Sequence, residues 1–251
     1  YGDAGEKLTQ TNANGAYAEY FYDDLYRLVL LANKKSNGDT ISSFEYSYDS
    51  VGNRLAKLSV GGDTELYSYD NLYQLTKVET KDKTTEYEYN AVGNRLQMKI
   101  LTTNDTNITN YNYNSDNQLL SYTIDGTDTV SFIYDANGNQ IIKATTNDTH
   151  YYSFDFENNM IGITAVNDTN VISYFYSPDG KRLKKTINNI TTKYFYEDDN
   201  CITEYDTNTT VQVRYTNNLS IDDIISSKRN SITEWYHKDA LGSVTDLTLS
   251  N

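Results

Sequence analysis

Short alternating stretches of apolar and polar residues recur along the whole chain. Segments such as RLAKLSV (54–60) and QLTKVET (74–80) place apolar residues at every second position, which is the period of a half-buried β-strand. An aromatic–x–aromatic pair precedes each of them, and its two rings point to the same face of a strand because they lie two residues apart. Polar segments such as VGGDTE (60–65) separate one strand pair from the next. The pattern predicts an all-β chain of tandem antiparallel β-hairpins.

The hairpins form a repeat of about 20 residues, a period typical of repeat proteins. We align the hairpins on the second aromatic residue of each pair and call it the anchor. The anchors are Tyr22, Tyr48, Tyr69, Tyr89, Tyr113, Tyr134, Phe154, Tyr176 and Tyr196. Tyr215 and His237 hold the same position in two degenerate continuations. We therefore predict an N-terminal lead-in (1–16), a repeat array (17–234) and a terminal repeat-like segment (235–251).

The turns after the anchors fall into two alternating classes. Each begins with Asp or Asn in most hairpins, whose side chain is suited to accept hydrogen bonds from backbone N–H groups across a turn. One class carries a turn glycine, and we add the glycine of the terminal segment to this set: Gly52, Gly93, Gly138, Gly180 and Gly242. For this class we predict a type I turn with a left-handed residue, and a bulge that adds one residue and keeps the next Leu or Ile on the ring-bearing face.

The other class has Tyr26, Tyr73, Asn117, Asn158 or Asn200 in place of the glycine. Asn tolerates left-handed backbone angles but Tyr does so poorly, so we expect a different turn there. Because the classes alternate, the predicted structural unit is a pair of turns.

Composition explains what holds such hairpins together. Of 251 residues, 25 are Tyr, and only 37% are hydrophobic. A single hairpin cannot offset its ordering entropy, so rings of successive hairpins must stack into a common lining. The net charge of −14 argues against nucleic acid and anionic membrane surfaces as partners. No apolar run approaches the roughly 20 residues of a membrane span, and YGDAGEKLTQ (1–10) lacks the features of a signal peptide.

Candidate chemistry is sparse, and we expect no catalytic, cofactor-binding or metal-binding residues. Cys201 is the single cysteine, and His150 and His237 are the two histidines, too few for a zinc site of Cys and His ligands. His237 takes an anchor position, which indicates packing instead of Ser-His-Asp catalysis. Pairs of neighbouring aspartates, such as residues 23–24, 198–199 and 222–223, fall at or near turns and are assigned to capping and solvation.

DANGN (135–139) superficially resembles a calcium loop. The twelfth position of such a loop requires a bidentate Glu but is Thr146 here. An EF-hand is excluded by this residue, while a looser calcium site stays an open alternative.

Seven Asn-x-Ser/Thr sequons are candidate N-glycosylation sites, and several of them lie in the links between hairpins. They begin at Asn104, Asn107, Asn147, Asn167, Asn189, Asn208 and Asn218.

Several segments resemble the YD repeat, also called the Rhs repeat. YSYDSVGNRL (46–55) and YEYNAVGNRL (87–96) alternate with YSYDNLYQL (67–75), and the closing WYHKDALGSVTDLT (235–248) is similar to the segment that ends such arrays. The resemblance covers residues 17 to 249 and implies a ribbon of hairpins wound into a continuous spiralling sheet or partial shell. In Rhs proteins and insecticidal toxin complexes the shell encloses a variable C-terminal toxin, and teneurins use a similar shell for cell-surface contact.

The resemblance implies a non-catalytic structural segment of an exported protein, extracellular or at the cell surface. Its scaffold would enclose or present a C-terminal domain, with neighbouring repeats, a toxin or a cell-surface ligand as partners. The family's self-cleavage region and toxin would lie beyond residue 251, so we expect a fragment of a longer protein or a short relative. The alternative is an adhesion or glycan- or protein-binding module that uses exposed Tyr. Open sheet edges also allow self-association.

Overall fold

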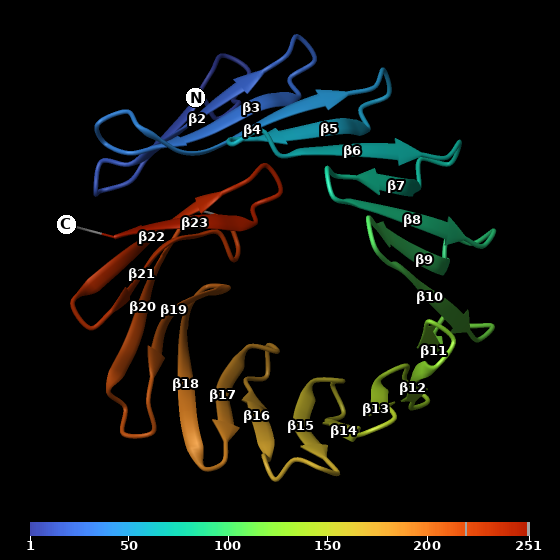
Figure 1. Ribbon diagram of the computed structural model, residues 1–251. Coiled ribbons are helices and arrows are strands. Elements are labelled where there is room, and N and C mark those ends of the chain that lie inside the picture. Colours follow the sequence, from blue (N-terminus) through green and yellow to red (C-terminus); the bar gives the residue numbers. More distant parts are fainter. Residues whose placement is uncertain (219, 250–251) are drawn as a thin grey trace. The chain divides into compact units, whose positions relative to one another are not determined.

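The computed structural model describes residues 1–218 and 220–249, and every regular element among them is a β-strand (Figure 1). The first strands are β1 (Thr9–Thr11), β2 (Tyr17–Tyr22), β3 (Leu28–Lys34), β4 (Thr40–Tyr48), β5 (Arg54–Ser59), β6 (Thr64–Tyr69), β7 (Leu75–Glu79) and β8 (Lys83–Tyr89). There follow β9 (Arg95–Thr102), β10 (Thr106–Tyr113), β11 (Leu119–Ile124), β12 (Asp128–Tyr134), β13 (Gln140–Ala144), β14 (Thr149–Phe154), β15 (Met160–Ala165) and β16 (Ile172–Tyr176). The last are β17 (Arg182–Ile187), β18 (Ile190–Glu197), β19 (Asn200–Tyr205), β20 (Val211–Asn217), β21 (Ile224–Arg229), β22 (Ile232–Lys238) and β23 (Val244–Leu249).

The strands pair antiparallel in chain order, from β1 to β7, from β9 to β19 and from β20 to β23. The prediction of an all-β chain of tandem antiparallel hairpins is confirmed. Two compact units are present: residues 1–84 with 213–251 form unit 1, and residues 85–212 form unit 2. Residues 250 and 251 of the predicted terminal segment lie outside the described residues.

Hairpins of both turn classes share one turn, so the expectation of a different turn at Tyr26 and Tyr73 is wrong. The Tyr196 hairpin is an exception: Glu197 pairs with Asn200, so Asn200 begins β19 and does not hold the left-handed position predicted for it, while Asp198 has a φ of 48°. In the glycine class, the Asp49 N–H donates to Asn53 O and the Gly52 N–H donates to Asp49 O. In the other class, Asp70 and Tyr73 repeat this pattern with Gln74 and Asp70 as acceptors. Tyr26 and Tyr73 have φ values of 59° and 62°. The hydrogen-bonded turn and its neighbours outweigh the steric preference of a single exposed Tyr.

The bulge is likewise common to both classes, because the register shifts immediately before Tyr48 and immediately before Tyr69. Our prediction that the glycine class gains a residue is therefore wrong. Tyr48 pairs with Arg54 and Tyr69 with Leu75, so the two classes differ in the residue that begins the return strand. Leu55 is consequently displaced to the opposite face, where it is 41% exposed, and Arg54 takes its place on the ring-bearing face.

The last two hairpins are offset from our alignment. Their register shifts fall immediately before Asn217 and Lys238, which pair with Ile224 and Val244. Asn217 and Lys238 therefore occupy the position of the anchors, and the assignments of Tyr215 and His237 to it are wrong. Counting back from the turn residue Asp239 finds the correct position, because the turn chemistry is kept where the aromatic pair has degenerated.

The main apolar cluster lies in unit 1. Leu31, Phe44 and Tyr46 are nearly inaccessible to solvent. Side chains of β2, β3 and β4 pack around them, together with Ala240 of the terminal segment. Hairpins that are far apart in sequence thus share one core within this unit.

Substitutions at the left-handed turn position should have opposite effects in the two turn classes. A Cβ added at Gly52 meets no atom within 4 Å, so Gly52→Ala isolates the cost of the backbone angle, about 1 kcal/mol of unfolding free energy. Tyr73→Gly relieves that cost at an exposed side chain and should stabilise the protein by about 0.5 kcal/mol. Urea unfolding of both variants measures the difference. Equal destabilisation by both changes would contradict this account of the turn.

Candidate functional site: the ring-bearing face and the docked terminal turn

The rings of the repeat lie on one face of each hairpin and are half-buried. All nine predicted anchors have intermediate exposure, and the ring two residues before an anchor is half-buried or, at Tyr46, buried. The residue between the two rings points to the opposite face. Phe175 and Phe195 stand in this intervening position and are each 56% exposed. Phe175 and Phe195 therefore expose their rings on the face opposite the repeated Tyr rings, whereas the still more exposed rings of Tyr26, Tyr73 and Phe156 lie in turns.

Anchor hydroxyls link each hairpin to the one before it. Tyr134 donates to the carbonyl oxygen of Leu119 at 2.9 Å, the residue that begins the return strand of the preceding hairpin. The same bond recurs at Tyr48 to Leu28, Tyr69 to Arg54, Tyr113 to Arg95 and Tyr196 to Arg182, over 2.7 to 3.1 Å. The phenol thus serves as a packing surface and as a hydrogen-bond donor between repeats, which explains why Tyr exceeds Phe among the anchors.

The one Phe among the predicted anchors allows a matched test of this link. Tyr134→Phe removes the donor and should lower the unfolding free energy by about 1 kcal/mol, since the Leu119 carbonyl loses its partner. Phe154→Tyr places a hydroxyl where it can reach the carbonyl of Gln140, which begins the preceding return strand, and should stabilise by about 0.5–1 kcal/mol. Thermal melts of the two single variants and the double variant measure both effects. Destabilisation by Phe154→Tyr would contradict the proposed role of the hydroxyl.

Arginine occupies the ring-bearing face between tyrosines of adjacent hairpins. The Arg95 guanidinium carbon lies 5.6 Å from the Tyr87 ring centroid and 4.6 Å from that of Tyr111. Arg182 stands in the same way over Tyr174 and Tyr194, at 5.4 and 5.1 Å. The Nε atoms of Arg54 and Arg95 are buried and have no hydrogen-bond partner. Contact with π-electrons therefore provides much of the stabilisation of these guanidinium groups.

Side-chain amides join a glycine-class turn to the turn that follows it. The Asn94 amide donates to Asn117 Oδ1 at 2.7 Å, and Asn139 donates to Asn158 Oδ1 at 2.8 Å. Asn117 and Asn158 hold the left-handed position of the second turn, with φ of 62° and 63°. These contacts give a physical reason for the alternation of the two classes. The glycine-class turn supplies the amide donor, and the turn that follows it supplies the amide acceptor.

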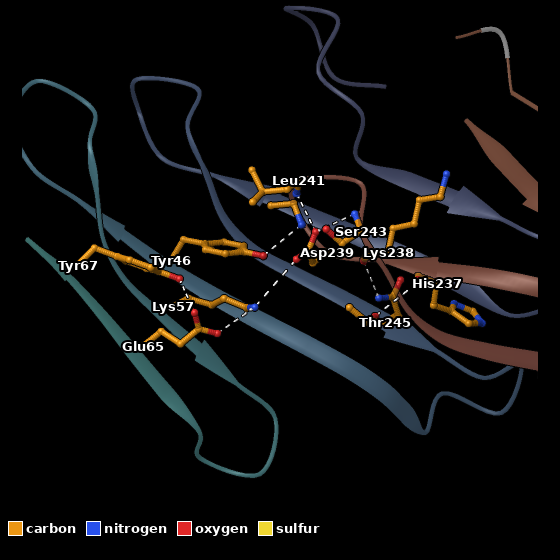
Figure 2. Close-up of polar contacts among 12 residues, drawn as sticks. Tyr46, Lys57, Glu65, Tyr67, His237, Lys238, Asp239, Leu241, Ser243 and Thr245 are labelled. Atoms are coloured by element: carbon orange, nitrogen blue, oxygen red, sulfur yellow. Dashed lines mark hydrogen bonds and ion pairs between the residues drawn. The ribbon is translucent and has the colours of Figure 1, made fainter. Parts of the chain in front are cut away.

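The terminal turn (239–243) is docked on β3 and β4 within unit 1 (Figure 2). Asp239 Oδ1 accepts the backbone N–H groups of Leu241 and Ser243 at 2.9 and 3.1 Å, as in the repeat turns. The Ala240 N–H donates to the Tyr46 hydroxyl at 3.1 Å, and the Asn33 amide donates to the carbonyl oxygen of Lys238 at 3.1 Å. A hairpin near the end of the sequence is thus held by hairpins near its start.

Charged side chains of β5 and β6 lie beside the docked terminal turn. Lys57 Nζ lies 3.3 Å from Glu65 Oε1 and 4.0 Å from Asp239 Oδ2 (Figure 2). The Tyr67 hydroxyl donates to Glu65 at 2.8 Å. Burial, followed by this hydrogen bond to a carboxylate, raises the pKa of Tyr67. Opposite charges are placed in alternation around the turn, which favours one orientation of docking.

Turn carboxylates have lowered pKa values because they accept backbone hydrogen bonds. Asp70 takes the N–H groups of Gln74 and Leu72 at 2.9 and 2.8 Å, and these bonds hold the pKa of its carboxyl below 3.8. The N–H of Asn159 does the same for the pKa of Asp155. Since 3.8 is also the ordinary value expected in the unfolded chain, the folded state binds protons less readily than the unfolded state.

Acidification should therefore destabilise the protein through these turns. The contribution is fully present above pH 3.8 and is lost as the pH falls from that value through the folded pKa. Asp70→Asn and Asp155→Asn should flatten the pH dependence below pH 4 and leave the turn intact, because Asn90 and Asn114 already form the same turn without charge. Urea midpoints measured from pH 6 to pH 3 test this. An unchanged slope in the double variant would exclude these carboxylates as its source.

The residues considered for catalysis or metal binding are not brought together. His150 is half-buried beside Asp148, with Nε2 and Oδ2 3.3 Å apart, whereas His237 is buried and contacts Thr248 Oγ1 at 2.9 Å. Burial lowers the pKa of His237 and raises that of the Cys201 thiol. Over residues 1–218 and 220–249, no group of three His, Cys, Asp or Glu side chains is arranged to hold a metal ion. Within the same residues, no helix has the length and apolarity needed to cross a bilayer.

The sequons differ in accessibility. Asn104, Asn147, Asn167, Asn189 and Asn208 are exposed, whereas Asn107 and Asn218 are half-buried. The Asn107 amide donates to Asp105 Oδ2 at 2.8 Å. Glycosylation of these residues stays a prediction.

Comparison with known proteins supports the fold. No family model and no curated protein matches the chain. A structure of the Photorhabdus luminescens Tc holotoxin pore carrying a TccC3 mutation matches all of this chain and 14% of its own, with 18% identity and a TM-score of 0.73. TcdB2–TccC3 without its hypervariable C-terminal region matches 95% of this chain and 16% of its own (16% identity, TM-score 0.44). TcdB2–TccC3 matches 92% of this chain and 17% of its own (14% identity, TM-score 0.42).

Of these three similarities, the first alone is high enough to establish a common fold. The chain spans 14% of the length of that relative. The resemblance to YD-repeat proteins, which rested on the alternating turns and aromatic pairs, is thus supported by an independent structural match. The chain has the tandem-hairpin fold of a segment of a Tc toxin protein.

Proposed function

We propose that this chain is a non-catalytic structural segment of an exported YD-repeat protein, and that its hairpins build a scaffold that encloses or presents a C-terminal domain. The proposal is supported most by one observation, that the repeated residues are engaged in folding contacts. Turn carboxylates bind backbone N–H groups, anchor hydroxyls bind the preceding hairpin, and arginines stack on rings. Few of the residues that recur in every repeat are therefore available for a catalytic role.

The similarity of fold to a Tc holotoxin chain supports a toxin-related role for the scaffold. An extracellular location follows from the same proposal. We further propose that residues 1–16 lead into the array, that 17–234 form it, and that 235–251 end it. The assignment of 235–251 to the end of the array is supported by the docking of the terminal turn on β3 and β4, because its hydrogen bonds to Tyr46 and Asn33 distinguish it from the repeat turns.

The test is limited proteolysis and electron microscopy of the natural gene product purified from its host. The expected result is a protease-resistant repeat region with a second domain that becomes cleavable only when the repeats unfold. Recovery of a free 251-residue chain from the cytosol would contradict the proposal. A hydrolase activity lost in His150→Ala would contradict its non-catalytic part.

A second candidate function is adhesion to a protein partner. It is favoured by the exposed aromatic side chains opposite the ring-bearing face, Tyr151, Phe175 and Phe195, because aromatic residues are enriched at interfaces. Phe175→Ser with Phe195→Ser should abolish binding to target cells and leave the melting temperature unchanged. Undiminished cell binding by this double variant would exclude the surface as the adhesive one.

A further inference from the structure

A histidine is buried where the first and last hairpins of unit 1 meet. His237 of β22 is 3% exposed and lines a cleft of about 610 Å³, together with Tyr20 of β2 and Ala240 of the docked terminal turn. Imidazole is the side chain whose ordinary pKa places its change of charge between pH 5 and pH 8. A buried imidazole at a contact between distant hairpins therefore makes that contact a candidate for control by pH.

A chain of hydrogen bonds ties this histidine to the start of the sequence. The Asn14 amide donates to Thr248 Oγ1 at 3.1 Å, and Thr248 Oγ1 lies 2.9 Å from His237 Nε2. Asn14 Oδ1 accepts the Ala16 N–H at 3.1 Å, which leaves the amide nitrogen to face Thr248. Because that amide donates to the threonine oxygen, the threonine hydrogen remains available to donate to His237. Nε2 is then an unprotonated acceptor, and the imidazole is neutral.

Protonation disrupts the last bond of this chain. An imidazolium carries hydrogens on both ring nitrogens, so His237 Nε2 can no longer accept the Thr248 hydroxyl hydrogen. The hydroxyl must rotate and lose that bond, and a charge appears on a side chain that is almost completely buried. A buried charge without a compensating partner costs far more free energy than a neutral hydrogen-bonded group. Both changes weaken the contact between Asn14 and the last hairpin.

The charged groups around His237 do not offset this cost. Asp246 of β23 pairs with His237 in register and favours the imidazolium. Burial outweighs this carboxylate, so the pKa of His237 lies below its ordinary value of 6.5. The ionisable groups that share the cleft with His237 are Lys7, Asp222, Asp223, Lys238 and Asp239, with the phenols of Tyr20, Tyr22 and Tyr236. Of these carboxylates, Asp223 is paired with Lys238 at 2.5 Å, and Asp239 caps its own turn.

We propose that His237 is a pH-sensitive latch, which holds the terminal hairpin β22–β23 against the first hairpins when neutral and undocks it when protonated. The hairpin stays paired with β21, so what opens is its contact with the turn before β2 and with β3 and β4. Undocking frees the Tyr46 hydroxyl and removes the cleft wall formed by Ala240. The latch is independent of the scaffold role, because either can hold without the other.

The pH window of the latch differs from that of the turn carboxylates. A histidine whose folded pKa is below 6.5 contributes stability that is fully present above pH 6.5 and is lost as the pH falls from that value through the folded pKa. The turn aspartates act in the same direction, but their loss begins from the lower value of 3.8. Undocking between these two values therefore reports on His237.

The experiment is hydrogen–deuterium exchange of the full chain from pH 7.5 to pH 4.5, read on peptides that cover 9–18 and 235–249. The hairpins of unit 2 serve as the internal reference for the intrinsic effect of pH on exchange. Relative to them, both peptides are expected to lose protection several-fold as the pH falls below 6.5, because the docked contact opens as a local unit. Full protection of both peptides down to pH 4.5 would overturn the proposal.

Two substitutions separate a pH-sensitive latch from a merely structural contact. His237→Gln keeps a neutral hydrogen-bonding side chain and should remove the pH dependence of docking in this window. Asp246→Asn removes the carboxylate that favours the imidazolium, so undocking should shift to lower pH. His150→Gln, which replaces the histidine of unit 2, is the matched control and should undock as the wild type does. The latch is also excluded if the pH dependence survives in His237→Gln, or if Asp246→Asn leaves the midpoint of undocking unchanged.

Discussion

Tyr46→Ala is expected to lower the free energy of unfolding of unit 1 by about 3–5 kcal/mol, the cost of removing a large aromatic ring from a core. Tyr46 is 6% exposed and packs with Leu31 and Phe44. Its ring also lies 4.2 Å from the Arg54 guanidinium carbon, and its hydroxyl accepts the Ala240 N–H. The substitution therefore leaves a cavity, a guanidinium without its π-partner and a terminal turn without its acceptor. Urea unfolding followed by tyrosine fluorescence and circular dichroism measures the loss.

Tyr46→Phe separates the docking bond from the packing. It keeps the ring and removes the hydroxyl alone, so we expect a loss of about 1 kcal/mol. Hydrogen exchange at the Ala240 amide should accelerate in this variant more than exchange in the other hairpins. If Tyr46→Ala cost no more than Tyr46→Phe, the cluster around Leu31 would not be the core of this unit.

The repeat could be predicted from the sequence because its determinants are local. An Asp or Asn after the anchor, together with a Gly or Asn three residues later, specifies the turn through bonds that span at most four residues. Strand alternation then fixes which face carries the rings. Hairpin positions and antiparallel pairing follow from these features without knowledge of any distant contact.

The error in the predicted turn length arose because the residue assigned to the start of the return strand was one position too late. Counting to the next aliphatic residue treated Leu55 as the partner of the anchor, whereas Arg54 begins the return strand. The long cationic side chain of Arg54 was not assigned to the ring-bearing face, where it packs against the Tyr46 ring. The alternation of Arg with Leu at this position, as in Arg54 and Leu75, was the available signal.

The docked terminal turn and the cleft beside it could not be predicted, because they depend on contacts between residues about 200 positions apart. Tyr46 looks like any other ring of the repeat, and Asn33 looks like an ordinary polar residue of β3. Both become distinctive when the terminal turn lies against them. Without a record of covariation, a sequence carries no sign of which repeat ring receives such a contact.

Arg95→Ala should be the most damaging change on the ring-bearing face of unit 2, with an expected loss of about 2–3 kcal/mol. Two guanidinium–ring contacts contribute about 0.5–2 kcal/mol each, and the aliphatic stem packs against the same rings. Arg95→Leu should cost less than half as much, since Leu75 and Leu119 begin the return strands of neighbouring hairpins, and an apolar side chain refills the space. Arg95→Lys should fall between the two, because an ammonium group cannot stack as a plane. If Arg95→Lys kept full stability and Arg95→Leu were as destabilising as Arg95→Ala, the positive charge would be what stabilises this position. If instead Arg95→Leu were less destabilising than Arg95→Lys, stacking and burial of the side chain between the rings would be the source of the stability.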